Sequence, residues 1–577
     1  MSTFYKKLGA FVVASAMLTS VFAGCGSSND SGAAGTGSAV PSSGSTAAAD
    51  EKTDPFMKFD KPVTIHVGQQ AYPTQKFPEG DTNEDNVFTR YLKDNFNIEI
   101  VVDWSAATGN DYNQKVNLCI ASNTLPDGMQ VDRKAFLSAA KSDMLYDFTE
   151  IFPKYVSPQV KAIMDSGDGI AYEYAKYNGK QLSMVGVDVA PSGQSMLNIR
   201  QDWLDKYNLK APTTIDEIEA VAKVFKEKKP AGNSTIPIAG PDKKSSVYTN
   251  FLQAGVMFAG FEPVFAAYDA YPGYWIKDGS GKAVYGTNTE NSKKALERLA
   301  DWYKQGLIDP EMGVRDSSTE LVNSGNVGMY FCAWWSIGYG TTDAYKKTPG
   351  ANWQAYPVKA DDGKWYTRMQ CPVASYTIFN KNISEDIAKA AVIMNNIWVR
   401  DENKLGSQNT SIYWYPLRNS MGALDECETS YKSLIKVLDG EAKAEDFNDP
   451  SSPYKLLYND AKNVTTVVKD YSKDKQLSIS NFDVNSPDFA RLYSILIGAR
   501  PTALATPDKL IYSEVYSQTP AMEAKWANLE TAEKEMSLKI ITGKDSTSTF
   551  DEYVKKWNNE GGTEILAEVQ KEMDSKK

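Results

Sequence analysis

Apolar and polar positions in the first third of the folded chain alternate between a strand period and a helical period. Short apolar or β-branched runs predict three strands, at 62–67, 98–102 and 129–131. Apolar residues at helical spacing predict two helices between them, over 83–95 and 111–122. This order of strands and helices is typical of a mostly parallel sheet covered on both faces, so the fold class is α/β.

A parallel sheet of this kind also predicts where a ligand binds. Ligands of such folds lie outside the carboxyl ends of the strands. We therefore expect a cleft beside the residues that follow the three predicted strands, among them Tyr72, Trp104, Asp132 and Arg133.

A second set of elements begins after a predicted boundary near 193–200. Asp202 to Tyr207 predicts a short helix, and Thr214 with Glu217 fits a capping box that opens a longer one. The apolar face of the longer helix consists of Ile215, Ile218, Val221, Ala222 and Phe225. Further along, the pattern predicts a hairpin around 275–287, a helix over 292–305 and a buried strand at 327–331. A strand at 374–379 returns to the first lobe, a helix follows over 384–399, and 521–577 is mainly helical.

The first 50 residues do not have the pattern of a folded domain. Lys6 and Lys7 precede an apolar run over 8–22, and small residues then precede Cys25. This order is typical of an export signal. The run is about 15 residues, shorter than the ~20 that span a bilayer, so an uncleaved anchor helix is the weaker alternative. Residues 26–54 are rich in Gly, Ser and Ala and are typical of a flexible tether.

Phe22-Ala23-Gly24-Cys25 resembles the lipobox of bacterial lipoproteins, with Phe22 where that motif usually has Leu. The resemblance implies that residues 1–25 form a lipoprotein signal peptide with its lipobox cysteine, and that Cys25 is acylated. It therefore implies a protein anchored by lipid at the extracellular face of the cell membrane.

Charge and histidine content exclude several classes of function. The net charge is -11, and loss of Lys6 and Lys7 with the signal changes it by two, to -13. No cluster of basic residues stands out, so we do not expect nucleic acid as a partner. The single histidine, His66, falls inside a predicted strand, which argues against most metalloenzymes and against serine hydrolases.

Four cysteines follow Cys25, namely Cys119, Cys332, Cys371 and Cys427. They form either two disulfides or buried free thiols, and the sequence leaves both open. No zinc spacing, Walker loop or dinucleotide fingerprint is present, and Asp278-Gly279-Ser280-Gly281 lacks the ligand spacing of a calcium loop. We therefore expect no metal and no cofactor.

Large aromatic residues are abundant, with 12 Trp and 32 Tyr. An indole or phenol ring can cover the apolar face of a sugar while polar groups bond its hydroxyls. The further candidates for ligand contact stand where strands end or loops begin: Trp275, Trp334, Trp335 and Trp414. Two adjacent Trp side chains cannot easily point into one core, so one of Trp334 and Trp335 is expected to face a cleft. For Arg200 and Asp202, a structural ion pair is favoured over ligand contact.

Several segments, in order along the chain, resemble the extracellular solute-binding proteins of the maltose-binding type, especially long lipoproteins of Gram-positive bacteria. They are Tyr112 to Asp127, Leu145 to Thr149, Ile199 to Leu204 with Pro212 to Thr214, Gly328 to Trp335, and the tail from Lys539 to Gly562. The resemblance implies a two-lobed type II fold with hinge strands, which captures a carbohydrate for an ABC importer. It also implies stacking by Trp334, because Cys332-Ala333-Trp334 stands where the family has Gly-Pro-Trp.

This interpretation divides the mature chain into two lobes. The N-terminal lobe is predicted over 55–198 and about 372–430, and the C-terminal lobe over about 199–371 and 431–577. We expect a monomer that binds and does not catalyse. Two alternatives are a secreted glycoside hydrolase using two carboxylates and a surface adhesin.

Overall fold

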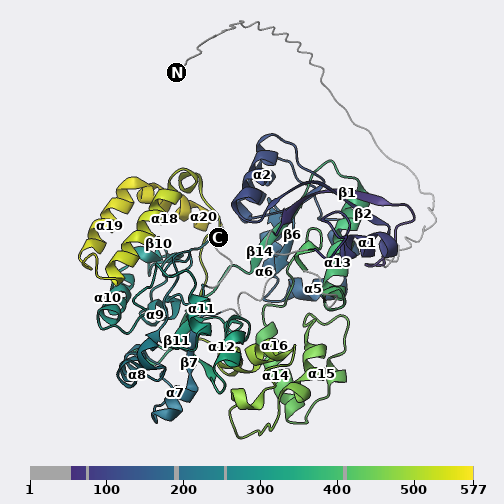
Figure 1. Ribbon diagram of the computed structural model, residues 1–577. Helices are drawn as coiled ribbons and strands as arrows, with labels where there is room; N and C mark the ends of the chain where they lie inside the picture. Colours follow the sequence, from purple (N-terminus) through teal and green to yellow (C-terminus); the bar gives the residue numbers. More distant parts are fainter. Residues whose placement is uncertain (1–52, 73–76, 188–193, 253–256, 407–411, 576–577) are drawn as a thin grey trace, which may run out of the picture. The chain divides into compact units, whose positions relative to one another are not determined.

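The computed structural model describes residues 53–72, 77–187, 194–252, 257–406 and 412–575 (Figure 1). The predicted signal, Cys25 and nearly all of the predicted tether lie outside these residues. Within them, no helix is both long and apolar enough to cross a membrane.

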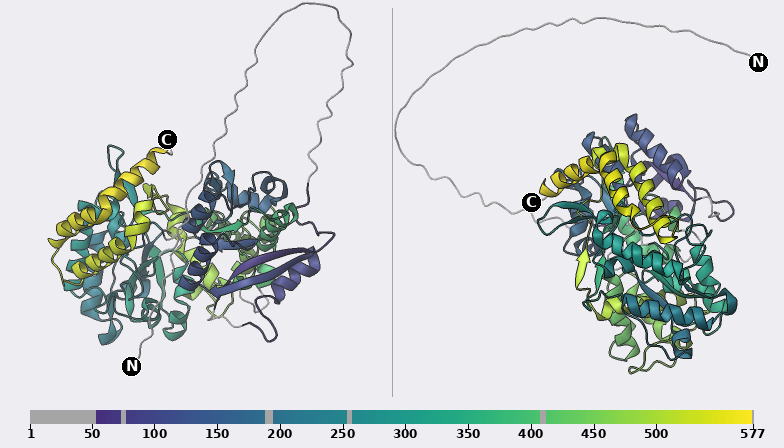
Figure 2. Two further views of the ribbon diagram at one scale, coloured as in Figure 1. Left: turned by 90° about the horizontal axis from the view of Figure 1, so that it is seen from above. Right: turned by 90° about the vertical axis from the view of Figure 1, so that its left-hand side faces the viewer.

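The first sheet has five strands in the order β2-β1-β3-β14-β6. Their bounds are β1 Val63–Ala71, β2 Ile98–Ala107, β3 Gly128–Val131, β6 Met184–Val187 and β14 Val373–Phe379. Strand β1 runs parallel to β2 and β3, whereas β14 runs antiparallel to β3 and β6. Figure 2 shows β1 and β2 as adjacent long ribbons in purple. The three predicted strands and their parallel pairing are confirmed.

Helices and two short strands complete this first lobe. They are α1 Val87–Phe96, α2 Asn110–Ala121, α3 Arg133–Lys141, α4 Phe152–Tyr155, α5 Pro158–Asp165, α6 Ile170–Ala175, α13 Glu385–Gly406, β4 Lys176–Tyr177 and β5 Lys180–Gln181. Helix α1 starts later than predicted because Asn86 caps it, accepting hydrogen bonds from the amides of Phe88 and Thr89. The sheet and helices enclose one apolar core, which includes Ile65, Phe88 and Ile393.

A second sheet has four strands in the order β12-β7-β11-β8. Their bounds are β7 Met196–Arg200, β8 Ile236–Ile238, β11 Val327–Cys332 and β12 Trp353–Tyr356. Every residue of β7 and β11 is buried, as expected for strands covered on both faces. Two smaller sheets pair β9 Trp275–Lys277 with β10 Ala283–Tyr285, and β13 Tyr366–Arg368 with β15 Lys509–Ile511.

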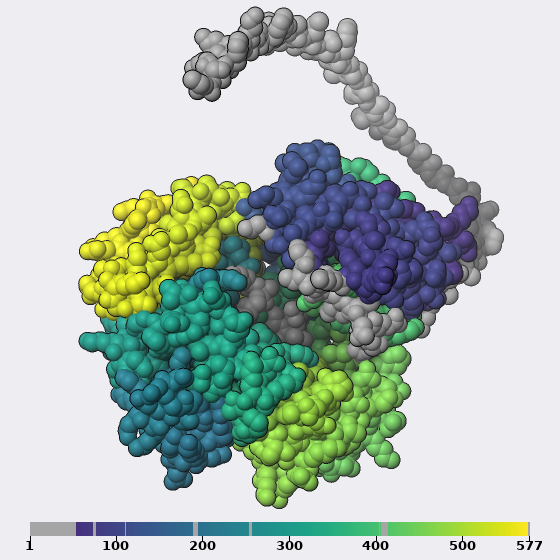
Figure 3. Space-filling model, viewed as in Figure 1, coloured from purple at the N-terminus to yellow at the C-terminus, as the bar shows by residue number. Residues whose placement is uncertain are grey.

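The helices of this second lobe are α7 Gln201–Lys206, α8 Ile215–Lys228, α9 Glu262–Ala267, α10 Glu290–Lys304, α11 Ser318–Asn323, α12 Thr342–Lys347, α18 Pro520–Ile541, α19 Thr549–Trp557 and α20 Thr563–Ser575. The predicted capping box of Thr214 and Glu217 is present, and the predicted apolar face of α8 is buried. Figure 3 shows α18 to α20 as one yellow surface.

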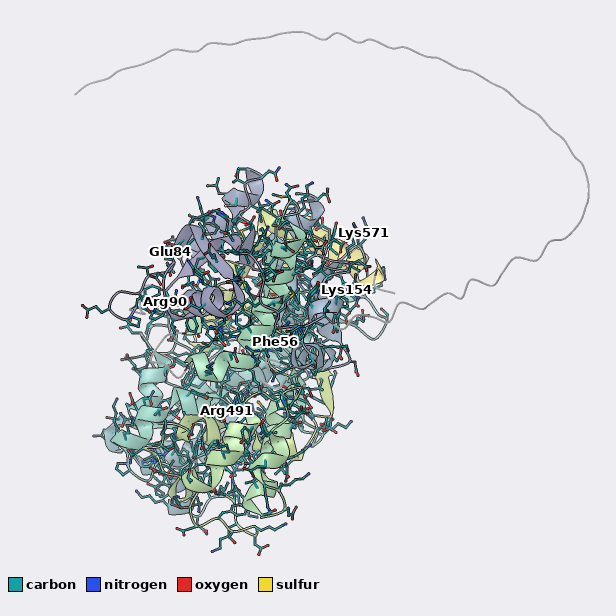
Figure 4. All side chains as sticks on the ribbon, turned by 90° about the vertical axis from the view of Figure 1, so that its right-hand side faces the viewer. Phe56, Glu84, Arg90, Lys154, Arg491 and Lys571 are labelled. Carbon is teal, nitrogen blue, oxygen red and sulfur yellow. The ribbon has the colours of Figure 1, made fainter. Side chains whose placement is uncertain are left out.

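Four more helices follow the first lobe along the chain and share an apolar core with β11 and β12 of the second sheet, namely α14 Glu426–Leu438, α15 Leu457–Val467, α16 Phe489–Tyr493 and α17 Arg500–Leu504. Arg491 ties three of them together (Figure 4). Its Nη2 lies 2.7 Å from Glu426 Oε1 and its Nε lies 3.1 Å from Asp460 Oδ2. Because all three side chains are at least 85% buried, this ion network fixes how α14, α15 and α16 pack.

The two main sheets have separate apolar cores, which divide the described chain into two α/β lobes. The four cysteines are buried free thiols, which resolves the alternatives that the sequence left open. Arg200 forms the favoured structural ion pair, with its Nη2 2.6 Å from Asp202 Oδ2. The predicted lobe boundaries and hinge strands stay predictions, since the first crossing includes residues 188–193, outside the described part.

Candidate functional site

A cavity of about 190 Å³ opens at the carboxyl edge of the first sheet. It lies where β1 and β3 end and where the antiparallel strand β14 begins, as expected for a ligand site in an α/β sheet. The segment that follows α13 forms the opposite wall. The lining residues are Gly68, Gln69, Gln70, Tyr72, Tyr112, Gln130, Ser375, Tyr413, Tyr415, Leu417, Arg418 and Ser420.

Two tyrosine rings form an aromatic wall. The rings of Tyr72 and Tyr413 lie 4.8 Å apart at an angle of 33°. Tyr413 is 41% exposed, an unusual position for a large ring. Tyr415 lies deeper and donates a hydrogen bond of 2.8 Å to the carbonyl of Met394. The wall therefore combines one exposed ring, Tyr413, and one half-buried ring, Tyr72, with a third ring anchored in the core.

Gly68 makes this edge of the sheet possible. Strand β1 has a register shift between Val67 and Gly68, and the indole of Trp104 lies across the strand there. A Cβ atom at position 68 would lie 2.3 Å from the Trp104 ring. Trp104 in turn packs on Tyr112, with ring centroids 5.4 Å apart, so the indole supports a lining residue from behind.

A chain of side-chain amides holds the floor of the cavity. Tyr72 donates a hydrogen bond of 3.0 Å to Gln70 Oε1, and Gln70 Nε2 donates one of 3.2 Å to Gln130 Oε1. Gln130 Nε2 then donates a 2.6 Å bond to the carbonyl of Arg418. These bonds fix both amides before a ligand arrives, which lowers the entropy cost of binding.

Arg418 supplies a positive charge. Its guanidinium lies 5.0 Å from the Trp398 ring centroid and 5.4 Å from that of Tyr413. Burial raises the pKa of Tyr72, and the Arg418 charge opposes that shift without cancelling it. The Tyr72 phenol is therefore neutral at physiological pH and can donate a hydrogen bond.

The cavity wall lacks the usual groups of acid–base catalysis. Among the described residues that line it, none is Asp, Glu, His or Cys. His66 does not line the cavity; its Nδ1 lies 2.7 Å from Asp103 Oδ1, and this hydrogen bond raises the pKa of its imidazole. No group of three potential metal ligands occurs within the described residues.

Of the residues predicted to follow the first three strands, Tyr72 lines the cavity and Trp104 supports it from behind. Asp132 instead caps α3, accepting a 2.8 Å hydrogen bond from the Ala135 amide. Arg133 lies outside the lining, where it donates a 3.0 Å bond to the Tyr376 hydroxyl and stacks 4.6 Å from the Tyr174 ring.

The four predicted tryptophans do not line the cavity. Trp275 is fully buried beside Phe251 and Tyr285, so it lies in a core in this structure and its role in stacking on a ligand stays a prediction. Trp334 is only 5% exposed, because the buried strand β11 leads its ring into a core rather than out of it.

The other two tryptophans pack against the cores as well. Trp335 is partly buried against the same core as Trp334. Trp414 is 4% exposed and stacks on Phe77 at 4.0 Å, while its neighbours Tyr413 and Tyr415 reach the cavity.

Sequence reasoning did not select Gln69, Gln70, Gln130 or Arg418. The two adjacent glutamines stand just before Tyr72 at the end of the first strand, so the rule that selected Tyr72 could have found them. Arg418 carries no such signal, because it reaches the cavity from a loop hundreds of residues away from β1.

The fold and this cavity define a two-lobed α/β binding protein with a polar, aromatic pocket at a sheet edge. A family model described as bacterial extracellular solute-binding protein matches residues 77–392, and the chain belongs to that family. It is therefore a binding protein and not an enzyme, and it belongs to an extracellular class.

Two curated relatives are similar in sequence to this chain over more than half of its length. Lipoprotein LipO of Bacillus subtilis is 22% identical over 83% of this chain and 87% of its own length. The fructooligosaccharide ABC transporter substrate-binding protein FusA of Streptococcus pneumoniae is 24% identical over 63% of this chain and 66% of its own.

Solved structures confirm the fold class. An extracellular solute-binding protein from Bifidobacterium longum subsp. infantis superposes with a TM-score of 0.56 at 16% identity, over 89% of this chain and 98% of that one. The alginate-binding protein AlgQ2 gives 0.55 at 17% identity, over 90% and 100%.

Proposed function

We propose that this protein captures an oligosaccharide outside the cell and delivers it to an ABC importer, as a monomer anchored to the membrane by lipid on Cys25. The observation that carries the proposal is the cavity wall, where the exposed ring of Tyr413 and the half-buried ring of Tyr72 lie beside pre-positioned amides and a guanidinium. Flat rings can cover the C–H face of a sugar, and amides can both donate to and accept from its hydroxyls.

The names of two relatives indicate that those proteins bind carbohydrates. FusA is named for fructooligosaccharide, and YtcQ of Bacillus subtilis, 24% identical over 37% of this chain and 41% of its own length, is named for polygalacturonan and rhamnogalacturonan. These names support the class of ligand and the transport role, and they differ in whether the sugar is neutral or acidic.

A glycoside hydrolase is the less favoured alternative at this site. Glycosidases place two carboxyl groups about 5 to 9.5 Å apart across the scissile bond. The described residues lining the cavity include no carboxylate, so this pocket lacks the pair that such chemistry needs.

The test is calorimetric titration of the chain lacking residues 1–25 with a panel of neutral and acidic oligosaccharides. Tyr413→Ala removes one exposed ring of the wall and should weaken binding several-fold to about tenfold. Tyr512→Ala is the matched control, because Tyr512 is similarly exposed at 39% and does not line the cavity.

Equal affinity of the wild type and Tyr413→Ala would remove the aromatic wall from the site. Failure of every oligosaccharide to bind at millimolar concentration would overturn the proposed carbohydrate role.

A further inference from the structure

The charge inside the cavity indicates which kind of sugar it takes. Arg418 is the one charged side chain among the described residues that line it, and every other lining residue is neutral. The chain as a whole carries -11. A positive side chain that faces the ligand in an otherwise acidic protein attracts a negatively charged ligand at that one place.

The guanidinium is not satisfied by the protein around it. Its Nε is buried and has no hydrogen-bond partner among the described residues. The carboxylate within ion-pair distance of it in the described chain is Glu402, with Oε1 3.9 Å from Nη2, too far for a hydrogen bond.

Glu402 is also engaged elsewhere. Its Oε2 forms a close ion pair with Lys455, whose side chain is only 10% exposed. Arg418 and Lys455 both lie within ion-pair distance of Glu402, but among the described residues the Arg418 guanidinium donates no hydrogen bond to a carboxylate.

The guanidinium is also held in place. It lies between the rings of Trp398 and Tyr413, at 5.0 and 5.4 Å from their centroids. Stacking of this kind fixes the plane of the guanidinium, and a fixed guanidinium offers two parallel N–H groups to a carboxylate.

We propose that the ligand carries a carboxylate, as an oligosaccharide containing uronic acid does, and that this carboxylate pairs with Arg418. The inference rests on the proposed function, since it specifies the sugar class for the same cavity. A single guanidinium whose Nε has no hydrogen-bond partner among the described residues matches one carboxylate, whereas the glutamines and tyrosines around it match hydroxyls.

The test compares an acid with its own neutral ester. The chain lacking residues 1–25 is titrated with trigalacturonate, with its fully methyl-esterified form and with the neutral trisaccharide 1-kestose. Wild type is expected to bind the acid at least about tenfold more tightly than the ester, because a charge-assisted hydrogen bond is about twice as strong as a neutral one.

Variants then assign the preference to one residue. Arg418→Gln should reduce the affinity for trigalacturonate at least about tenfold and leave that for the ester within a factor of about two. Arg418→Lys keeps the charge without the planar fork and should lose part of the preference. Arg90→Gln is the charge-matched control, because Arg90, labelled in Figure 4, pairs with Asp81 and Asp85 and does not line the cavity. Thermal melting of each variant checks that it folds.

The outcomes separate this inference from the proposed function. Equal binding of acid and ester by the wild type, or tight binding of 1-kestose alone, would overturn the carboxylate and leave carbohydrate capture standing. An acid preference that persists in Arg418→Gln would overturn the role of Arg418. Binding of no sugar would overturn both. The comparison of acid with ester needs no variant, so it decides the question even if Arg418→Gln does not fold.

Discussion

Single residues at the edge of the first sheet decide how the cavity wall is built. Gly68 lets an indole lie flat across β1, and that indole supports Tyr112, whose hydroxyl donates a 2.9 Å hydrogen bond to the carbonyl of Gln130. A packing contact behind the wall is thus linked to the amide chain that forms its floor. Residues that never touch the ligand can therefore control its affinity.

This link predicts the effect of a single methyl group. Gly68→Ala would place Cβ 2.3 Å from the Trp104 ring, so the ring or the strand must move. We expect a loss of about 1 to 3 kcal/mol in the free energy of unfolding, together with weaker ligand binding. Urea denaturation and calorimetry measure the two effects. Gly279→Ala is the control, because a Cβ there meets no atom within 4 Å. Unchanged stability of Gly68→Ala would contradict the predicted clash.

At the scale of elements, buried polar groups join helices to strands across long sequence distances. Glu533 on α18 accepts hydrogen bonds from the hydroxyls of Tyr248, Tyr285 and Thr287, at 2.9, 2.7 and 2.7 Å. Its side chain is 4% exposed, and burial raises the pKa of its carboxyl above the ordinary value of 4.5. The contacts of α18 with these three hydroxyls therefore include one buried carboxyl group whose pKa is raised.

The raised pKa of Glu533 predicts a dependence of stability on pH. The folded chain holds this proton more tightly than the unfolded chain, so the stabilisation is fully present below pH 4.5 and is lost as the pH rises through the folded pKa. Glu533→Gln, which cannot ionise, should therefore compare more favourably with wild type at pH 8 than at pH 5. Urea denaturation at both pH values measures this difference. An identical difference at the two pH values would contradict the prediction.

Much of the secondary structure was predictable from the sequence, but the cavity was only partly predictable. Strands β1 to β3 and helix α8 follow from local periodicity and capping, because their apolar faces repeat within a few residues. Tyr72 followed from the rule for strand ends. Arg418 could not be found, since it reaches the cavity through tertiary contacts across about 300 residues. Trp275 and Trp334 lie in apolar cores, because a large ring fills a core as readily as it lines a surface.

At the scale of the whole molecule, the predicted export signal and tether indicate where the protein is expected to work. If Cys25 is acylated, the chain belongs in the membrane fraction although no helix within its described part could span a bilayer. Cys25→Ser should move the protein into the culture medium, or leave it as an uncleaved precursor. Fractionation with labelled palmitate measures both location and modification. Equal membrane association and no label in the wild type would contradict the lipid anchor.

The buried thiols described above have a practical consequence for studying this protein. Burial raises the pKa of Cys371 to about 11 and of Cys332 to about 12, and it also raises that of Cys119. The thiolate is the reactive form of cysteine, so maleimide reagents should not label these native cysteines. A cysteine engineered on each lobe could then carry a donor and an acceptor dye, and energy transfer between them would report in real time whether the lobes approach when sugar is added.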